Sequence, residues 1–405
     1  MQSKKSLYLF AAFFVLYELN VYLSNDMIMP GMPAVVHEFH ASLSNVALSL
    51  TVYIIGGSLL QVFLGPLSDV IGKRKIMLSG GVLFLIASII IPFSHSISQF
   101  LAARLFQGMG LCFIFIGYAV IHELFDDVEA VRLTALLANI AIFAPLIGPV
   151  IGGAIIYISH WQFVFIVSAT LVSISLIGLY KYMPTGKIIY PRPRLPEILT
   201  SYKNILTHKN FMFGIGTTAL SIVPILSWIG LSPVIIMEVM HKPFSTYLIY
   251  QSIIFTGFIL SSLAVQKVAG RFSFYQIIIF GSKLAFAGVV LAGVFHGYSI
   301  IFVAGMCLYA FGFGLYNGPI IRISLMDTGE STSLSASIMS LIFSVCLAIG
   351  MQFCNKICEQ FGYSLASLAI IDSVIGVIVA ILAYRFAVIN RNRMWDKQQP
   401  TVAVH

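Results

Sequence analysis

Residues 7–36 read LYLFAAFFVLYELNVYLSNDMIMPGMPAVV and form the first long apolar segment of the chain. An α-helix rises about 1.5 Å per residue, so about twenty residues cross the hydrocarbon core of a bilayer. This segment is long enough to cross, yet Glu18 and Asp26 lie in its interior. A carboxylate inside a membrane span costs several kcal/mol and usually faces a bundle interior, a water-filled cavity or an ion path. The segment therefore predicts a functional membrane helix of a transporter.

The composition of the whole chain excludes an ordinary soluble domain. Hydrophobic residues make up 59% of the 405 residues, charged residues make up 9%, and the mean hydropathy is +0.96. We therefore expect an all-α membrane protein surrounded by the lipid bilayer. The net charge of +8 is expected to lie in the loops and not on a nucleic-acid-binding surface. No small-residue cleavage site follows Lys4 and Lys5, so we expect the first segment to be retained.

Twelve apolar segments predict twelve transmembrane helices, six in each half of the chain. They lie at about 8–36, 43–70, 75–94, 98–121, 132–158, 162–182, 209–238, 244–268, 273–294, 298–326, 332–357 and 363–388. A Pro-rich and basic stretch between the sixth and seventh segments indicates a cytoplasmic linker. The predicted domains are an N-terminal six-helix bundle at 1–182, a linker at 183–208, a C-terminal six-helix bundle at 209–390 and a cytoplasmic tail at 391–405.

The positions of Lys and Arg predict the orientation of these helices. If both termini are cytoplasmic, the basic residues outside the spans fall almost entirely in inner loops, and only Lys242 and Lys356 fall in outer loops. Basic residues near the ends of a span resist translocation, so this orientation is favoured. The inverted orientation is hard to sustain.

The two halves also resemble each other weakly. Gly108-Met-Gly110-Leu in the fourth predicted span matches Gly312-Phe-Gly314-Leu in the tenth, and the segment 69–73 matches 267–271. Repeats of this kind let two pseudo-symmetric bundles move around a site near the bilayer midplane. Chance similarity between two Gly-rich helices is the alternative.

Three motifs resemble signatures of the major facilitator superfamily. GPLSDVIGKRK at 65–75 resembles the loop signature between its second and third helices, although Val70 stands where the signature has a basic residue. RLFQGMG at 104–110 resembles the fourth-helix motif of its proton-coupled members, and GPVIGG at 148–153 resembles its fifth-helix antiporter motif. The resemblance implies the twelve-helix fold of this superfamily. It assigns conformational roles to Gly65, Asp69, Gly72, Arg74, Gly148, Pro149, Gly152 and Gly153.

The first helix is similar to that of the MdfA-type multidrug/proton antiporters of this superfamily. The likeness lies in YE at 17–18 and NDMIMPGM at 25–32, and TALLAN at 134–139 adds to it. It implies a proton-coupled antiporter that exports lipophilic cationic or neutral drugs by alternating access. It further implies a bacterial inner membrane, a monomer, protons as the coupling ion, and no other cofactor.

Proton coupling is expected at Asp26, Glu18 and Arg104. Eight residues along one helix separate the two acids by about 12 Å axially and about 80° in projection, so both could line one cavity without pairing. By resemblance, Arg104 faces Asp26, substrate and proton compete for Asp26, and Glu18 selects cationic compounds. Substrate contacts are expected from Tyr22, Asn25, Asp26, Glu18, Met32, Tyr118, Ala138, Asn139, Trp228 and Ile229, with Phe115, Phe255, Tyr309 and Asn317 as further wall residues.

Several alternatives stay open. Each acid could be neutralised in a structural hydrogen bond, and each wall residue could be plain helix packing. Export of one metabolite or siderophore is the alternative transport function, and a non-transporting receptor or intramembrane enzyme is a different class. The five Cys residues form no cluster with His, so no metal site is predicted. Lys283 and Asp372, in the ninth and twelfth spans, predict a structural ion pair.

Overall fold

The computed structural model describes residues 4–185, 195–268, 271–330 and 332–392, and every element in these ranges is a helix. The chain forms two compact units, each described below by itself. Unit 1 contains the residues up to Leu199 together with Ile229–Phe244. Unit 2 contains Thr200–Trp228 and the residues from Ser245 onward. The domain limits predicted from the sequence stay a prediction, and parts of the predicted linker and tail lie outside the described residues.

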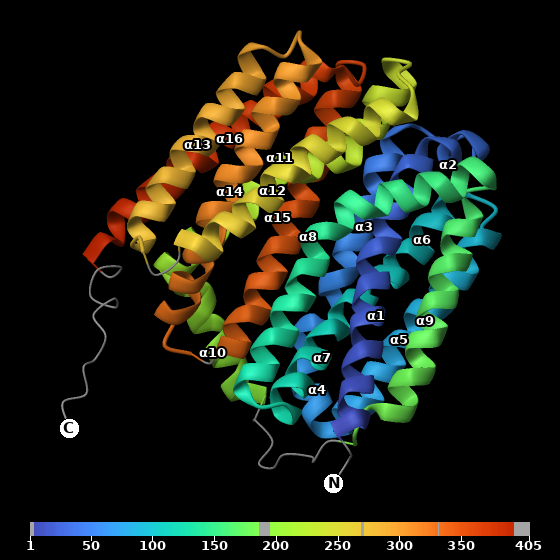
Figure 1. Ribbon diagram of the computed structural model, residues 1–405, viewed down its shortest axis with the longest axis vertical. Helices are drawn as coiled ribbons and strands as arrows, with labels where there is room; N and C mark the ends of the chain where they lie inside the picture. Colours follow the sequence, from blue (N-terminus) through green and yellow to red (C-terminus); the bar gives the residue numbers. More distant parts are fainter. Residues whose placement is uncertain (1–3, 186–194, 269–270, 331, 393–405) are drawn as a thin grey trace. The chain divides into compact units, whose positions relative to one another are not determined.

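Several predicted spans of unit 1 consist of more than one helix (Figure 1). Pro30 and Pro33 lie at the starts of the second and third pieces of the first span, where the missing proline N–H needs no partner. The second span is interrupted at Leu60 and the fourth at Met109. The helices of unit 1 are α1 (Lys4–Ile28), η1 (Met29–Gly31), α2 (Met32–Glu38), α3 (Ser44–Leu59), α4 (Gln61–Ile71), α5 (Lys73–Ile90), η2 (Ile91–Phe93), α6 (Ile97–Gly108), α7 (Gly110–Leu124), α8 (Asp127–Ile158) and α9 (Gln162–Tyr182).

The second half of the chain begins with α10 (Leu195–Thr207), which falls within the predicted linker. The remaining helices follow the predicted spans closely: α11 (Lys209–Pro233), the π-helix η3 (Val234–Val239), α12 (Phe244–Val268), α13 (Phe274–Val294), α14 (Ser299–Asp327), α15 (Thr332–Gln360) and α16 (Leu365–Ile389). Residues of α11 up to Trp228 belong to unit 2, and those from Ile229 belong to unit 1.

Helix length and composition support a multi-pass membrane protein. Within the described residues, 10 helical segments are long and apolar enough to cross a membrane. The shorter apolar helices Ser44–Leu59 and Phe143–Ile158 lie within the second and fifth predicted spans. The prediction of an all-α membrane protein is therefore confirmed.

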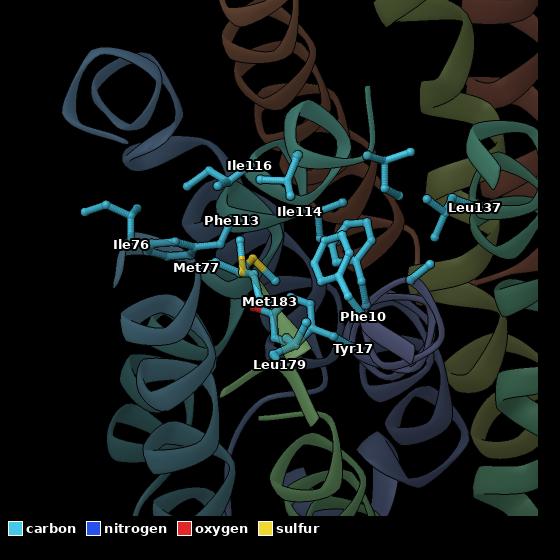
Figure 2. Packing of buried hydrophobic residues seen from close by; sticks show 14 of the residues in the cluster. Phe10, Tyr17, Ile76, Met77, Phe113, Ile114, Ile116, Leu137, Leu179 and Met183 are labelled. Atoms are coloured by element: carbon cyan, nitrogen blue, oxygen red, sulfur yellow. The ribbon is translucent and has the colours of Figure 1, made fainter. Parts of the chain in front are cut away.

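An aromatic and aliphatic core holds α1 in the middle of unit 1. Phe10, Phe14, Tyr17 and Val21 recur every three or four residues along α1, and none of them is accessible to solvent. They pack with residues of α5, α7 and α9, and Figure 2 shows labelled members of this cluster from these helices gathered around Phe10 and Tyr17. Close packing of this kind, and not water exclusion, stabilises helix association inside a bilayer. Because this apolar face of α1 is fixed in the core, the rotation of α1 about its own axis is fixed, and so is the direction of its polar face.

Residues 200–207 of α10 belong to unit 2 and pack against its other helices. Ile205 is fully buried in a cluster with Phe211, Ile215 and Ile338. The amide of Asn204 donates a 2.9 Å hydrogen bond to Glu330, and this bond holds the pKa of Glu330 below its usual value. The described part of the linker is therefore a docked helix.

The predicted ion pair between Lys283 and Asp372 is wrong. Their helices α13 and α16 pack against each other, but the two side chains face different ways. Asp372 is fully buried and its Oδ1 lies 2.6 Å from Ser227 Oγ of α11, whereas Lys283 is exposed. Neighbouring helices were foreseen correctly, but the sequence did not give their rotation.

Candidate functional site

The polar face of α1 is the centre of the candidate site. Glu18, Tyr22 and Asn25 follow each other at helical spacings of four and three residues, so they share one side of the helix, with Asp26 next to Asn25. Glu18 is 1% exposed and Asp26 is 6% exposed. α1 runs between α8 and α9, and it packs closely against both (Figure 1). Both acids therefore lie inside a helix bundle, as the cost of a carboxylate in lipid requires.

Arg104 of α6 is a fully buried cation, and its hydrogen bonds go to uncharged groups. Its guanidinium donates to Asn25 Oδ1 at 2.7 Å, to Gln107 Oε1 at 2.6 Å and to Ser49 Oγ at 3.4 Å. Its Cζ atom also lies 4.4 Å from the centroid of the Tyr53 ring. Among the described residues, no carboxylate lies within 4.0 Å of it. The expected direct pair with Asp26 is therefore not present.

Asn25 connects Arg104 to Asp26. Its oxygen accepts from Arg104, while its Nδ2 donates to Asp26 Oδ1 at 3.3 Å. An amide placed in this way presents its acceptor to a cation and its donors to an anion, so its dipole is complementary to both. A change in the charge of Asp26 would therefore change the hydrogen bonding of Arg104 through the single side chain of Asn25.

Buried hydrogen bonds also connect the surroundings of Arg104 to α5 and α3. Gln107 accepts from Arg104 and donates through Nε2 to Ser88 Oγ of α5 at 2.9 Å. Tyr53 of α3 donates to the Val21 carbonyl at 2.6 Å, which fixes the ring that lies over the guanidinium. Sequence reasoning missed Ser49, Tyr53 and Ser88 as members of the site. Each of them is a polar residue in an otherwise apolar helix, and this is the only feature in the sequence that could have indicated them. That they lie next to each other depends on how the helices pack.

Glu18 has a different partner. Tyr118 of α7 donates to Glu18 Oε1 at 3.0 Å, and the buried Oε2 has no hydrogen-bond partner in the described structure. Glu18 and Tyr118, each predicted separately as a substrate contact, are thus brought together. A carboxylate oxygen with an unused acceptor position can receive a proton or the donor group of a ligand.

Glycines of α8 allow it to cross α1 at Asp26. A Cβ atom on Gly148 would lie 2.6 Å from Asp26 Cβ, and one on Gly152 would lie 1.9 Å from the Met27 carbonyl oxygen. A Cβ on Gly153 would overlap the Phe244 ring at 1.9 Å. Pro149 lies inside the same helix. The structure therefore gives this motif a close-packing role, and a hinge role stays a prediction.

The loop motif after α4 is described only in part. Gly72 has φ +104°, a conformation that favours glycine, and it separates α4 from α5. The guanidinium of Arg74 donates to the Tyr180 carbonyl, and Lys73 pairs with Glu123. The surroundings of Gly65 and the side chain of Asp69 lie outside what the structure describes, so the predicted roles of both residues stay predictions.

The other predicted contact residues lie in different surroundings. Tyr22 and Asn25 are half-buried on the polar face of α1, whereas Met32 is fully buried in α2. Trp228 is fully buried in unit 2 and donates to Gln251 at 2.6 Å, while Ile229 belongs to unit 1. The side chains of Ala138 and Asn139 lie outside the described ones. A substrate role for each of these residues stays a prediction.

The chemistry of this arrangement is that of proton and charge exchange. The described residues contain no group of three or more His, Cys, Asp or Glu side chains that could hold a metal ion. Two buried carboxylates and one buried guanidinium are held by hydroxyls and amides, which can reorganise when one charge changes. The site therefore offers binding positions for protons and for small cations.

Comparisons with known proteins identify the family of this chain. Residues 14–351 match the family model described as Major Facilitator Superfamily. The chain is 37% identical to the multidrug transporter MdfA of Yersinia pestis (strain Angola) over 85% of this chain and 86% of the relative. It is 37% identical to that of Escherichia coli, over 85% of both chains, and 36% identical to that of Edwardsiella piscicida, again over 85% of both.

Two solved structures have the same fold. A bacterial homologue of the human lysosomal transporter Spinster superposes with a TM-score of 0.73 at 13% identity, over 100% of both chains. A D-xylose–proton symporter superposes with a TM-score of 0.73 at 15% identity, over 94% of this chain and 98% of that one. The predicted twelve-helix architecture of the superfamily is thereby supported by fold as well as by sequence.

Proposed function

The chain belongs to the Major Facilitator Superfamily, and on this basis we propose that it is a proton-coupled multidrug efflux antiporter of a bacterial inner membrane. Its substrates are lipophilic small molecules, cationic or neutral, and both of its termini are cytoplasmic. The relatives that carry the name multidrug transporter MdfA support this, since they match 85% of the chain at 36–37% identity. The basic inner loops predicted from the sequence support the orientation.

The observation that carries the proposal is the bridge from Asp26 to Arg104 through Asn25. Asp26 has one hydrogen bond from a neutral amide and no cation within 4.0 Å in the described structure, so its negative charge is only partly compensated. A proton or a cationic substrate can supply the missing compensation. Because both act on the same carboxylate, binding of one disfavours the other, which is what antiport requires.

The transport cycle follows from this competition. When the site is accessible from the cytoplasm, substrate binds and a proton leaves Asp26. When it is accessible from outside, a proton rebinds Asp26 and substrate is released. Arg104 senses each change through Asn25, because loss of the Asp26 charge weakens the acceptor that orients the amide. The inward proton gradient thus drives outward movement of substrate.

Glu18 supplies selectivity for positive charge. It lies two helical turns before Asp26 on α1, and Tyr118 occupies only one of its oxygens. A cationic substrate gains attraction from this carboxylate, whereas a neutral substrate does not. A neutral substrate can still compete with the proton by donating a hydrogen bond to the ionised Asp26 carboxylate, because such a bond favours the charged form.

Transport in proteoliposomes tests the proposal. With the protein reconstituted and a pH gradient imposed, we expect uptake of ethidium and of chloramphenicol into the compartment with the higher proton concentration. Asp26→Asn should abolish this uptake, while Glu123→Gln, which neutralises an exposed carboxylate in unit 1, should leave it unchanged. Uptake that is independent of the gradient, or that is limited to one compound in a broad panel, would overturn the proposal.

A further inference from the structure

Unit 2 contains a buried acid that the proposed function does not use. Asp372 of α16 has no solvent-accessible surface. Its Oδ1 lies 2.6 Å from Ser227 Oγ of α11, and its buried Oδ2 has no hydrogen-bond partner among the described residues. An ionised carboxylate with a single hydrogen bond inside a membrane protein is costly.

The groups around Asp372 do not compensate a negative charge. The titratable side chains that interact with it are Tyr309 of α14 and Cys354 and Cys358 of α15, and none of these is a cation. The Tyr309 hydroxyl is directed elsewhere, since it donates to the Ser221 carbonyl at 2.6 Å. Lys283 on the adjacent α13 is exposed, and the described residues hold no cation within 4.0 Å of Asp372.

The hydroxyl of Ser227 makes two short contacts and has only one proton. Its Oγ lies 2.6 Å from Asp372 Oδ1 and 2.9 Å from the Pro224 carbonyl oxygen. A carbonyl can only accept, so an ionised Asp372 would leave two acceptors sharing one hydroxyl proton. A protonated Asp372 resolves this, because its O–H donates to Ser227 Oγ and the Ser227 O–H then donates to Pro224.

We propose that Asp372 is a proton-binding site in unit 2, held as a neutral carboxylic acid that donates to Ser227. The unpartnered Oδ2 is then an ordinary carbonyl oxygen, which costs less to bury than half of a carboxylate. Loss of the proton would turn the Ser227 hydroxyl from Pro224 to Asp372. The protonation of Asp372 in α16 is thereby coupled to the backbone carbonyl of Pro224 in α11, which lies one turn before Trp228.

The inference goes beyond the proposed function and does not depend on it. It concerns the protonation state of one side chain in unit 2, which can be measured without transport and without substrate. Failure of drug transport would leave it standing, and its own failure would leave the competition at Asp26 untouched.

Infrared spectroscopy of the purified protein tests the proposal. A band from the C=O stretch of a protonated carboxyl should be present in the parent protein at neutral pH, shift in D₂O, and be absent in Asp372→Asn. Ser227→Ala should move this band to higher wavenumber, because the acid loses its acceptor. Ser373→Ala is the matched control, since that hydroxyl donates to the Val289 carbonyl at 2.8 Å and should leave the band in place.

Two results would overturn the proposal. One is that Asp372→Asn removes intensity only from the carboxylate stretching bands, which would mean an ionised Asp372. The other is that no protonated-carboxyl band moves in Ser227→Ala, a measurement that remains decisive if Asp372→Asn does not accumulate. Selective ¹³C labelling of aspartate, combined with Asp26→Asn, separates this band from those of Glu18 and Asp26.

Discussion

The two units bury carboxylates in different electrostatic settings. In unit 1, Asp26 is one amide away from the buried guanidinium of Arg104, within a network that crosses four helices. In unit 2, Asp372 has a serine hydroxyl and no nearby cation among the described residues. A site that holds both charges can exchange them, whereas a lone acid is best accommodated as a neutral group. The difference supports the proposal that charge exchange takes place in unit 1.

The matching glycine motifs of the two units also differ in the helices that they contact. A Cβ on Gly108 would meet the Tyr53 backbone of α3 at 2.1 Å, whereas one on Gly312 would meet the Ala285 backbone of α13 at 2.4 Å. It is Gly314, two residues later, that faces α12 through Ser261. The sequence repeat is therefore out of register with the packing. Unit 1 also interrupts this helix at Met109, while α14 continues through the motif.

The largest effect is expected on removing the cation of unit 1. Arg104→Met strands Asn25 and Gln107 and removes the positive charge nearest Asp26, so we expect a loss of about 3–5 kcal/mol in unfolding free energy and no transport. Arg104→Lys keeps the charge but not the fork of donors, and it should recover stability only in part. Thermal unfolding of the purified variants measures this. Unchanged stability of Arg104→Met would contradict the network.

The next largest effect is expected at the crossing of α8 over α1. Gly152→Ala would place a Cβ 1.9 Å from the Met27 carbonyl oxygen, so helix backbones must move apart next to Asp26. We expect a destabilisation of about 1–3 kcal/mol and strongly reduced transport. Gly216→Ala is the control, because nothing lies within 4 Å of its Cβ position. Equal behaviour of the two variants in unfolding and transport would argue against a tight crossing.

A smaller, substrate-dependent effect is expected at Glu18. Glu18→Gln removes a charge but keeps an acceptor for Tyr118, so transport of cationic compounds should fall about tenfold, equivalent to about 1.4 kcal/mol, with neutral compounds little affected. Tyr118→Phe should change the same ratio less, since the carboxylate remains. Transport rates for matched cationic and neutral drugs give the ratio. A uniform loss for both classes would indicate a structural role for Glu18.

The smallest effect is expected at Lys283 of unit 2. Its side chain is exposed and makes no ion pair with Asp372, so Lys283→Gln should change the unfolding free energy by less than about 0.5 kcal/mol. Asp372→Ala, which empties a fully buried position and leaves Ser227 without this partner, should cost clearly more. Chemical or thermal unfolding compares the two. A large loss of unfolding free energy in Lys283→Gln would contradict this account and support an ion pair with Asp372.

Hydropathy was enough to predict most helices but not their interruptions. The predicted segments 162–182, 244–268 and 273–294 agree with α9, α12 and α13 almost to the residue, because polar residues and helix caps such as Ser273 bound them. The breaks at Leu60 and Met109 were not foreseen. Both lie within apolar sequence, where hydropathy stays high and does not mark the end of one helix and the start of the next.

For the candidate site, the sequence predicted which residues are buried but not which partners their side chains contact. Asp26, Glu18 and Arg104 were placed inside helical spans from the sequence, and all three are buried; Glu18 and Tyr118 were each named as substrate contacts, but not as a pair. The rotation of each helix did not follow from the sequence. By resemblance Arg104 was expected to face Asp26, and it does so through Asn25 and not by a direct ion pair, while Asp372 faces Ser227 and not Lys283. Serines 49 and 88 gain their roles only from partners on other helices.

Drug-induced proton release tests the competition at Asp26 most directly. The detergent-purified parent, Asp26→Asn and Glu18→Gln proteins are mixed in weakly buffered solution with ethidium and with chloramphenicol, and released protons are counted with a pH indicator. Competition predicts release from the parent with both drugs and none from Asp26→Asn. Binding of either drug to the parent without proton release, or undiminished release from Asp26→Asn, would contradict it.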